Sequence, residues 1–319
     1  MDLPSEDSLR WLVARYASLL AAHGEGIGTP HLVQPTGDDF PDAFEVSGPG
    51  VARFLQRMIE YAPVSNDLDI QLRLREDQGD SASCGTGGCG TGACGDGKSA
   101  SAPRLLDRVI DADDAYIVEF SERDLSPPVR LATTFARSVG SLVLFEAEEE
   151  VDPKDLGVTS EIAAVACGFG VLLLAGSHMV GKSCGGFSIA QHTHLSASEH
   201  GVLLAVFTRL HGIKPAHARA YLEPTQREAF DEALEWVDSN SALVADLGAR
   251  PEMLADGVFK IEPVKGLLGR LFSGSKAANP LPEIAPVSSR RKTRTAEDQR
   301  RLDEARAMVD AALGKAGSS

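Results

Sequence analysis

The sequence has no excess of basic residues and no segment that is typical of a secretory signal. Lys and Arg number 31 against 46 Asp and Glu, which gives a formal net charge of −15. So acidic a chain repels phosphates, which argues against a general nucleic-acid binder and against binding to anionic membranes. The start of the chain, MDLPSEDSLRW, is acidic and lacks the basic, apolar and small-residue order of a signal peptide. We therefore expect a freely soluble protein.

Long apolar runs and cysteines are also scarce. The longest apolar stretch, residues 162–176, covers about fifteen residues and includes three glycines. This is short of the roughly 18–20 residues that span a bilayer, so it predicts a buried core helix and no membrane span. Five cysteines, an odd number without a signal peptide, indicate a reducing cytoplasm and no disulfide framework.

Apolar periodicity predicts an α+β protein that is mostly helical. Strands with alternating apolar residues are expected at 68–75 and 115–121, which form a small sheet packed on helices. Ser196 with Glu199 three residues later reads as a capping box at a helix start. The expected helices cover 9–20, 49–62, 127–150, 159–176, 195–212 and 224–239.

The predicted organisation is one domain over 1–250, followed by a flexible tail. A glycine- and serine-rich insertion, 76–103, interrupts the domain. Residues 251–294 are expected to be a linker with a short basic amphipathic segment, and 295–315 a final helix with a narrow apolar seam. This helix either docks on another helix or remains marginal on its tether.

The octapeptide GSHMVGKS, 176–183, matches the phosphate-binding pattern G-x-x-x-x-G-K-[ST]. A P-loop needs a strand before the glycines and a helix that carries Lys182 and Ser183 in its first turn. The preceding apolar run is too long for one strand, and the Cys-Gly-Gly after Ser183 is a poor helix start. We interpret the octapeptide as a loop between two helices, with nucleotide binding as the third of three functional hypotheses.

Six segments, taken in order and spacing, resemble a family of uncharacterised bacterial zincin-like proteins (HExxH metallopeptidase-like). The resemblance covers about residues 27–245 and implies a zincin-like core. The segments are PTGDDFPDAF (35–44), IQLRL (70–74), YIVEF (116–120), LATTFARSVGSLVL (131–144), TSEIAAVACGFGVLLLAG (159–176) and HLSASEHGVLLAVFTRLHG (194–212).

In that family, the segment that matches 132–144 carries A-T-x-x-A-H-E-L-x-H-x-x-L, in which two histidines bind zinc and the glutamate acts as general base. Here Arg137 replaces the first histidine, Ser138 the glutamate and Ser141 the second histidine. Arginine has no lone pair for zinc, and serine is a weak ligand. Glu161 matches the acid on the following helix, and one carboxylate does not hold a metal. The resemblance therefore implies a degenerate peptidase site.

Two interpretations of Arg137 and Glu161 remain open. They form a buried salt bridge where ligands once faced each other, or they are ordinary solvated helix charges. The leading hypothesis is a catalytically inactive zincin-like protein, a pseudo-metallopeptidase that binds or scaffolds a protein partner and needs no cofactor.

The alternative hypothesis is a metal-binding protein. Cys84, Cys89 and Cys94 form a C-x4-C-x4-C run in the glycine-rich insertion, where thiolates can hold zinc, copper(I) or an iron–sulfur cluster. Cys184 and His178 are candidates for the fourth ligand. The alternative without a metal is an insertion whose cysteines are free thiols. A second candidate metal site consists of four histidines, His178, His192, His194 and His200. The alternative is that they are ordinary surface histidines before a helix cap. Cys167 is expected to be a buried small apolar side chain.

Overall fold

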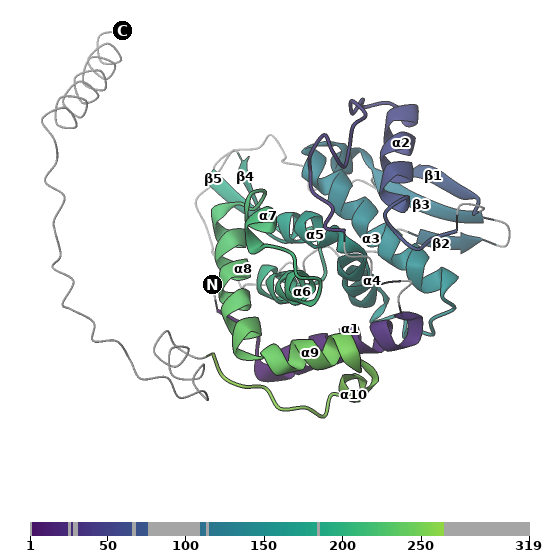
Figure 1. Cartoon of the computed structure of the whole chain (residues 1–319). Helices are drawn as coiled ribbons and strands as arrows, with labels where there is room; N and C mark the ends of the chain where they lie inside the picture. Colours follow the sequence, from purple (N-terminus) through teal and green to yellow (C-terminus); the bar gives the residue numbers. More distant parts are fainter. Residues whose placement is uncertain are drawn as a thin grey trace, which may run out of the picture. The chain divides into compact units, whose positions relative to one another are not determined.

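The structure is a computed structural model that describes residues 2–24, 27, 31–65, 68–75, 109–112, 115–183 and 186–264. The chain divides into two units, Met1–Leu271 and Phe272–Ser319, and every described residue belongs to the first. The predicted insertion with its three cysteines, Cys184 and the predicted final helix lie outside the described residues. Within the described part the fold is α+β and mostly helical, as predicted (Figure 1).

Helix boundaries follow local capping signals. Ser5 caps the first helix through the backbone N–H of Ser8, and Gly24 ends it with a φ of 52°. Ser196 and Glu199 form the predicted capping box. The helices are α1 (Glu6–His23), α2 (Gly48–Ile59), α3 (Pro128–Glu146), α4 (Leu156–Ala164), α5 (Gly170–Ser177), α6 (Ala197–Leu210), α7 (Pro215–Arg219), α8 (Pro224–Ser239), α9 (Ser241–Ala249) and α10 (Glu252–Ala255).

A three-stranded sheet packs on one side of α3. Its order is β1 (Ile70–Arg75), β3 (Ala115–Ser121), β2 (Val109–Ala112), with β1 parallel and β2 antiparallel to β3. Phe120 of β3 meets Phe135 of α3 edge to face, and Tyr116 stacks on Phe145. Strands β1 and β3 confirm the prediction, whereas β2 was not predicted because its four residues, VIDA, are too few for a period.

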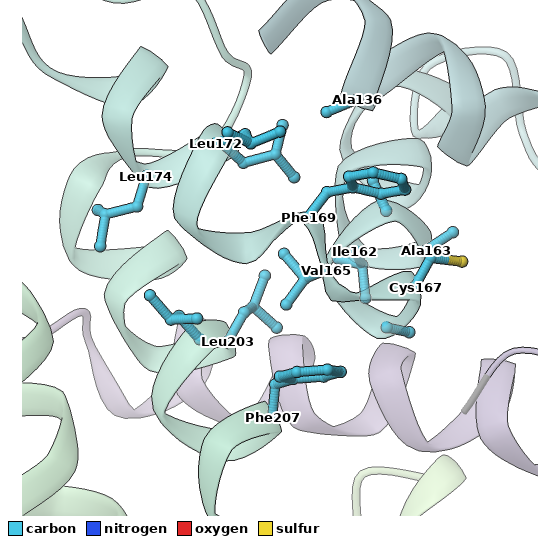
Figure 2. Close-up of a cluster of buried hydrophobic side chains, with 14 of the residues drawn as sticks. Ala136, Ile162, Ala163, Val165, Cys167, Phe169, Leu172, Leu174, Leu203 and Phe207 are labelled. Carbon is cyan, nitrogen blue, oxygen red and sulfur yellow. The ribbon is translucent and has the colours of Figure 1, made fainter. Parts of the chain in front are cut away.

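On its other side α3 packs against α4 and α5, and α6 lies beyond them between α5, α1 and α8 (Figure 1). Their facing side chains form the centre of the core, with Phe169, Leu172, Leu203 and Phe207 fully or almost fully buried (Figure 2). The segment Leu156–Ser177 is long and apolar enough to cross a membrane, but 89% of its most apolar window is buried inside the protein. It is the central core segment of this fold, as the sequence predicted for 162–176.

The predicted single helix at 159–176 is interrupted. A π-helical turn, η3 (Val165–Phe169), separates α4 from α5, and Gly168 within it has a φ of 96°. A Cβ at Gly168 would lie 1.9 Å from the carbonyl oxygen of His31, and the Gly168 carbonyl accepts a hydrogen bond from Val33. The extended segment 31–33 therefore packs against the kink, where a residue with a side chain would clash and only glycine fits.

A β-hairpin, β4 (Met179–Ser183) and β5 (Gly186–Ala190), connects α5 to the loop before α6. The prediction of a plain loop between two helices at 176–183 was therefore wrong in its local structure. Each strand has only five residues, and Gly181 and Gly186 shorten the apolar–polar alternation by which a strand is recognised. Val180 and Ile189, which face each other across the hairpin, are both exposed.

Residues 251–264, at the start of the predicted linker, pack on the domain. Arg10 of α1 donates to the carbonyl oxygens of Gly257 and Phe259, and its guanidinium lies 5.3 Å from the centre of the Phe259 ring. The Asn240 side chain donates to the Glu262 carbonyl and accepts from its N–H. The packed part of the chain therefore extends past residue 250.

Candidate functional site

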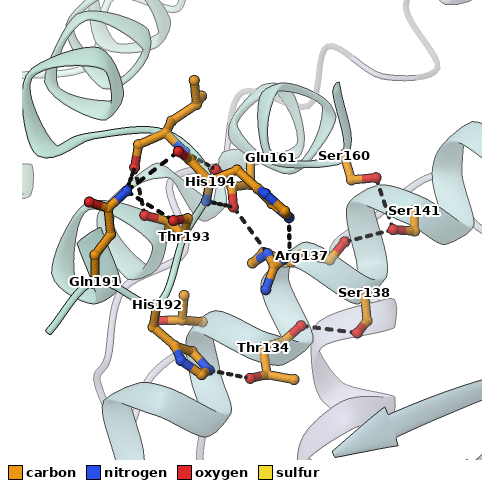
Figure 3. A network of polar contacts seen from close by, with 12 residues as sticks. Thr134, Arg137, Ser138, Ser141, Ser160, Glu161, Gln191, His192, Thr193 and His194 are labelled. Atoms are coloured by element: carbon orange, nitrogen blue, oxygen red, sulfur yellow. Dashed lines mark hydrogen bonds and ion pairs between the residues drawn. The ribbon is translucent and has the colours of Figure 1, made fainter. Parts of the chain in front are cut away.

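The middle of α3 approaches α4 closely. A Cβ at Gly140 would lie 1.9 Å from the Ser160 carbonyl oxygen, so the two backbones meet there without a side chain between them. Arg137 and Ser141, one turn apart, lie on the face of α3 that contacts α4 (Figure 3). Every residue from Leu131 to Leu144 is buried, so polar groups on this face need partners inside the protein.

Arg137 and Glu161 form the buried ion pair that the sequence raised as a hypothesis. Nε of Arg137 lies 3.0 Å from Oε1 of Glu161, with side-chain exposures of 4% and 0% (Figure 3). This confirms the salt-bridge interpretation over the solvated-charge one. Because both groups have left water, their attraction is not screened, and each depends on the other to avoid an uncompensated buried charge.

The loop before α6 supplies further partners for Glu161. The backbone N–H groups of His194 and Leu195 donate to Oε1 and Oε2 at 2.6 and 2.9 Å. Nε2 of His200, also fully buried, lies 3.2 Å from Oε2. Burial alone raises the pKa of Glu161, but the hydrogen bond and charge of His200, the charge of Arg137 and the Leu195 N–H outweigh it. The pKa therefore lies below its usual value, and the carboxylate is ionised at neutral pH.

His194 completes this group of charges. Its Nε2 lies 2.6 Å from Nη2 of Arg137, and because a guanidinium only donates, Nε2 must be the acceptor. The imidazole fits there because residue 157 is glycine: a Cβ at Gly157 would lie 2.2 Å from His194 Nε2. We call Arg137, Glu161, His194 and His200 the ionic cluster.

The two serines at the degenerate positions are occupied with other hydrogen bonds. Ser138 donates to the Thr134 carbonyl of its own helix, and Ser141 bonds to Ser160 of α4 at 2.9 Å and to the Arg137 carbonyl. Ser141 thus joins α3 to α4 beside the ion pair (Figure 3). Neither hydroxyl faces a position where a metal ion would be shared with Glu161.

His192 belongs to a separate group. Its Nε2 lies 2.9 Å from Thr134 Oγ1 and 3.1 Å from Asp124 Oδ1, while Asp124 also accepts from the N–H and hydroxyl of Ser121. A catalytic triad uses both ring nitrogens, one toward the nucleophile and the other toward the acid. Here one nitrogen serves both partners, so the arrangement ties η2 (Glu122–Leu125), α3 and the 191–195 loop together and does not relay a proton.

Metal and phosphate chemistry find little support in the described part of the chain. No group of three or more His, Cys, Asp or Glu side chains there is arranged to hold a metal ion. Of the four candidate histidines, His194 and His200 belong to the ionic cluster, His192 lies beside Asp124, and His178 lines the cavity described below. In the P-loop match, Gly176 lies in α5, whereas Lys182 and Ser183 lie in β4. The strand–loop–helix arrangement that cradles phosphate is therefore not formed.

A large cavity opens beside the N-terminal half of α3. Its volume is about 1010 Å³, at the upper end of typical ligand pockets. Its apolar wall comes from Phe40, Phe54, Leu131, Val171 and Leu172, and its rim includes Arg53, Arg57, His178, Val180 and Tyr221. The cavity was not predicted, because its walls come from five segments that are distant in sequence.

Comparison of the whole chain with protein-family models, curated proteins and solved structures gave no match.

Proposed function

We propose that this protein is a zincin-like chain without peptidase activity, and that it acts by binding a ligand in the cavity beside α3. One observation carries the proposal. Arg137, Ser138 and Ser141 stand where the resembled family places its metal ligands and general base. Arg137 is engaged in a buried ion pair with Glu161.

The chemistry of the ionic cluster supports an inactive site. A guanidinium cannot donate electrons to a metal ion, and the Glu161 carboxylate already accepts two backbone N–H groups and contacts Arg137 and His200. Arg137, Glu161 and His200 are also buried, so a substrate does not reach the Glu161 carboxylate, whereas His194 is partly exposed. The role of the cluster is structural: it joins α3, α4, the 191–195 loop and α6, and of these α3 lines the cavity.

The cavity supports a binding role. It is large, mostly apolar and bordered by a few polar side chains, which is typical of ligand sites. Leu131 and Ala132 line it less than two turns before Arg137 on the same helix. The cluster therefore fixes the helix that forms one wall of the cavity.

The test is metal analysis and peptidase assay of the full-length protein purified without chelator. We expect no stoichiometric metal on the domain and no chelator-sensitive cleavage of a mixed peptide substrate. The matched control is the triple variant Cys84→Ser, Cys89→Ser, Cys94→Ser, which separates metal on the insertion from metal on the domain. Metal that disappears in this variant favours the alternative function, a metal-binding protein. Chelator-sensitive cleavage in both proteins would overturn the proposal.

A second arm tests the zincin-like geometry itself. The combined substitution Arg137→His, Ser138→Glu, Ser141→His places two imidazoles one turn apart on the α3 face toward Glu161. We expect cobalt(II) to bind this variant with the absorption of a tetrahedral site. Adding Glu161→Gln should weaken this binding, whereas adding the remote Glu252→Gln should not. A folded variant that binds no cobalt would argue against the zincin-like arrangement of α3 and α4.

A further inference from the structure

Much of the cavity lining is apolar, and we call this part the floor. Phe40, Phe54 and Phe44 form a connected set of tilted and edge-to-face rings along α2 and the 35–44 loop. Opposite them lie Leu131 of α3 and Leu172 of α5. Few polar groups reach this floor, so a polar solute would lose its hydration there without gaining hydrogen bonds. The floor therefore fits a hydrocarbon chain or ring.

The charged residues that line the cavity are two arginines and two carboxylates, and they are not equally engaged by partners. Asp42 is paired with Arg57 at 3.3 Å, and Glu223 is used as the N-terminal cap of α8, where its side chain accepts a backbone N–H. Arg53, in contrast, is 52% exposed, and its nearest paired carboxylate, Glu45, lies 3.8 Å away. A guanidinium has five N–H donors, so this loose contact leaves most of them for a ligand. The two rim carboxylates are thus engaged, while a rim cation has donors to offer.

The backbone at the start of a helix adds to the positive potential of the Arg53 guanidinium. The first turns of α3 and α8 both border the cavity, through Pro127, Pro128 and Val129 and through Pro224, Thr225 and Gln226. No side chain caps α3, and its first turn contains no acidic residue. A helix N-terminus attracts negative charge, so the start of α3 favours the same sign of ligand charge as Arg53, whereas the start of α8 already faces the Glu223 carboxylate.

We infer that the cavity binds a single apolar chain with an anionic end group, the apolar part on the phenylalanine floor and the anion beside Arg53. This inference rests on the proposed binding role and specifies its ligand class. Such a molecule is either a free amphiphile or a lipid taken from a membrane. Both sources share the chemistry, and the experiment separates them.

Isothermal titration calorimetry of the full-length protein with dodecanoate, kept below its micellar concentration, tests the inference. We expect saturable binding with one site per chain. Dodecyltrimethylammonium, with the same chain and the opposite charge, should bind at least about tenfold more weakly. Arg53→Gln should weaken dodecanoate binding about tenfold, the effect of losing one charge-assisted hydrogen bond. Arg250→Gln, at an exposed arginine whose residue does not line the cavity, is the matched control and should change nothing.

Filling the cavity supplies an independent arm. Ala132→Phe projects a ring into it from α3, and Ala43→Trp does so from an exposed loop position where folding is not at risk. Both should abolish dodecanoate binding while the thermal unfolding of the Ala43→Trp variant stays that of wild type. Equal binding of the anionic and cationic amphiphiles, or unchanged binding in both filled variants, would overturn the inference.

Two further outcomes are informative. Sedimentation with phosphatidylglycerol vesicles assigns the source: dodecanoate binding without vesicle binding indicates a free amphiphile, and binding to both indicates a membrane lipid.

If dodecanoate does not bind, but peptides selected from a random display library bind wild type and not Ala43→Trp, the ligand class is wrong and the binding role stands. The binding role and the absence of catalysis are judged separately, because metal content and peptidase activity do not depend on the amphiphile.

Discussion

At the scale of the residue, Glu161 organises the interior of this protein. Its two oxygens contact an arginine, a histidine and two backbone N–H groups, and the most distant of these residues in sequence, His200, is 39 positions away (200 − 161). A carboxylate buried without these partners would be strongly destabilising. The partners compensate the buried charge of Glu161, and their contacts with it hold α3, α4, the 191–195 loop and α6 together.

The first prediction concerns the Arg137–Glu161 pair. Glu161→Gln and Arg137→Met should each lower the free energy of unfolding by about 3–5 kcal/mol, because each leaves a buried partner uncompensated. Arg137→Met combined with Glu161→Leu should recover much of that loss, and urea denaturation measures all three. The matched control is the exposed pair Arg209–Asp238, where Asp238→Asn should cost no more than about 1 kcal/mol. Equal costs at both pairs would contradict the buried-pair interpretation.

The second prediction is the pH dependence of the same carboxylate. The folded pKa of Glu161 is lower than its unfolded value of 4.5, so the folded state binds its proton less readily. The contribution to stability is therefore complete well above pH 4.5, begins to fall near it and continues to fall below it. The difference in unfolding free energy between wild type and Glu161→Gln, followed by urea denaturation from pH 7 to 4, should shrink at the acid end. A constant difference would refute the lowered pKa.

The sequence predicted part of this cluster. Arg137 and Glu161 were paired because both positions matched the ligand positions of the resembled family, and the structure joins them. His194 and His200 were considered as metal ligands and not as partners of this pair. Nothing local in the sequence indicates that their loop and helix return to Glu161, since such contacts depend on how distant elements pack. Gly157 leaves room for the His194 ring, but the sequence does not indicate that this glycine is needed until the contact is known.

At the scale of the element, close packing of α3 and α4 depends on an absent side chain. Gly140 stands where a methyl group would overlap the Ser160 carbonyl. The third prediction is that Gly140→Ala lowers the melting temperature and costs about 1–3 kcal/mol, because the helices must separate. Gly48→Ala in α2, where a Cβ meets nothing within 4 Å, should be within about 1 kcal/mol of wild type. Equal stability of both variants would show that the helices adjust freely.

Elements with a strong period were predictable and short ones were not. Helices α1, α3, α6 and α8 follow apolar spacing of three and four, and α1 and α6 begin after the common capping residues Ser5 and Ser196. The strands β2, β4 and β5 were not predicted because each is only four or five residues long, and Ile110, Val180 and Ile189 in them are exposed. The kink at Gly168 escaped for a different reason: a glycine within an apolar run is equally compatible with a continuous helix.

At the scale of the whole molecule, the packed unit extends beyond the predicted domain boundary. The buried apolar residues of the described part all lie between Leu9 and Leu254. Residues up to 264 add contacts to α1 and to Asn240. The end of the predicted domain at 250 therefore separates α10 from the helix on which it packs.

The fourth prediction follows from these contacts. A chain that ends at residue 264 should unfold cooperatively at the melting temperature of the full-length protein, whereas one that ends at 250 should melt several degrees lower because α1 loses its cover. Circular dichroism of the three proteins at equal concentration measures the difference. A chain ending at 250 that is as stable as the longer ones would restore the predicted boundary.

The free cysteine in the kinked core segment has a practical consequence. Cys167 is fully buried, and burial raises the pKa of its thiol to about 12, so almost no reactive thiolate forms at ordinary pH. An alkylating reagent reaches this sulfur only when the central helices come apart. Mass spectrometry can follow how fast the peptide that contains Cys167 is labelled. This labelling rate therefore measures how often the interior of the protein opens.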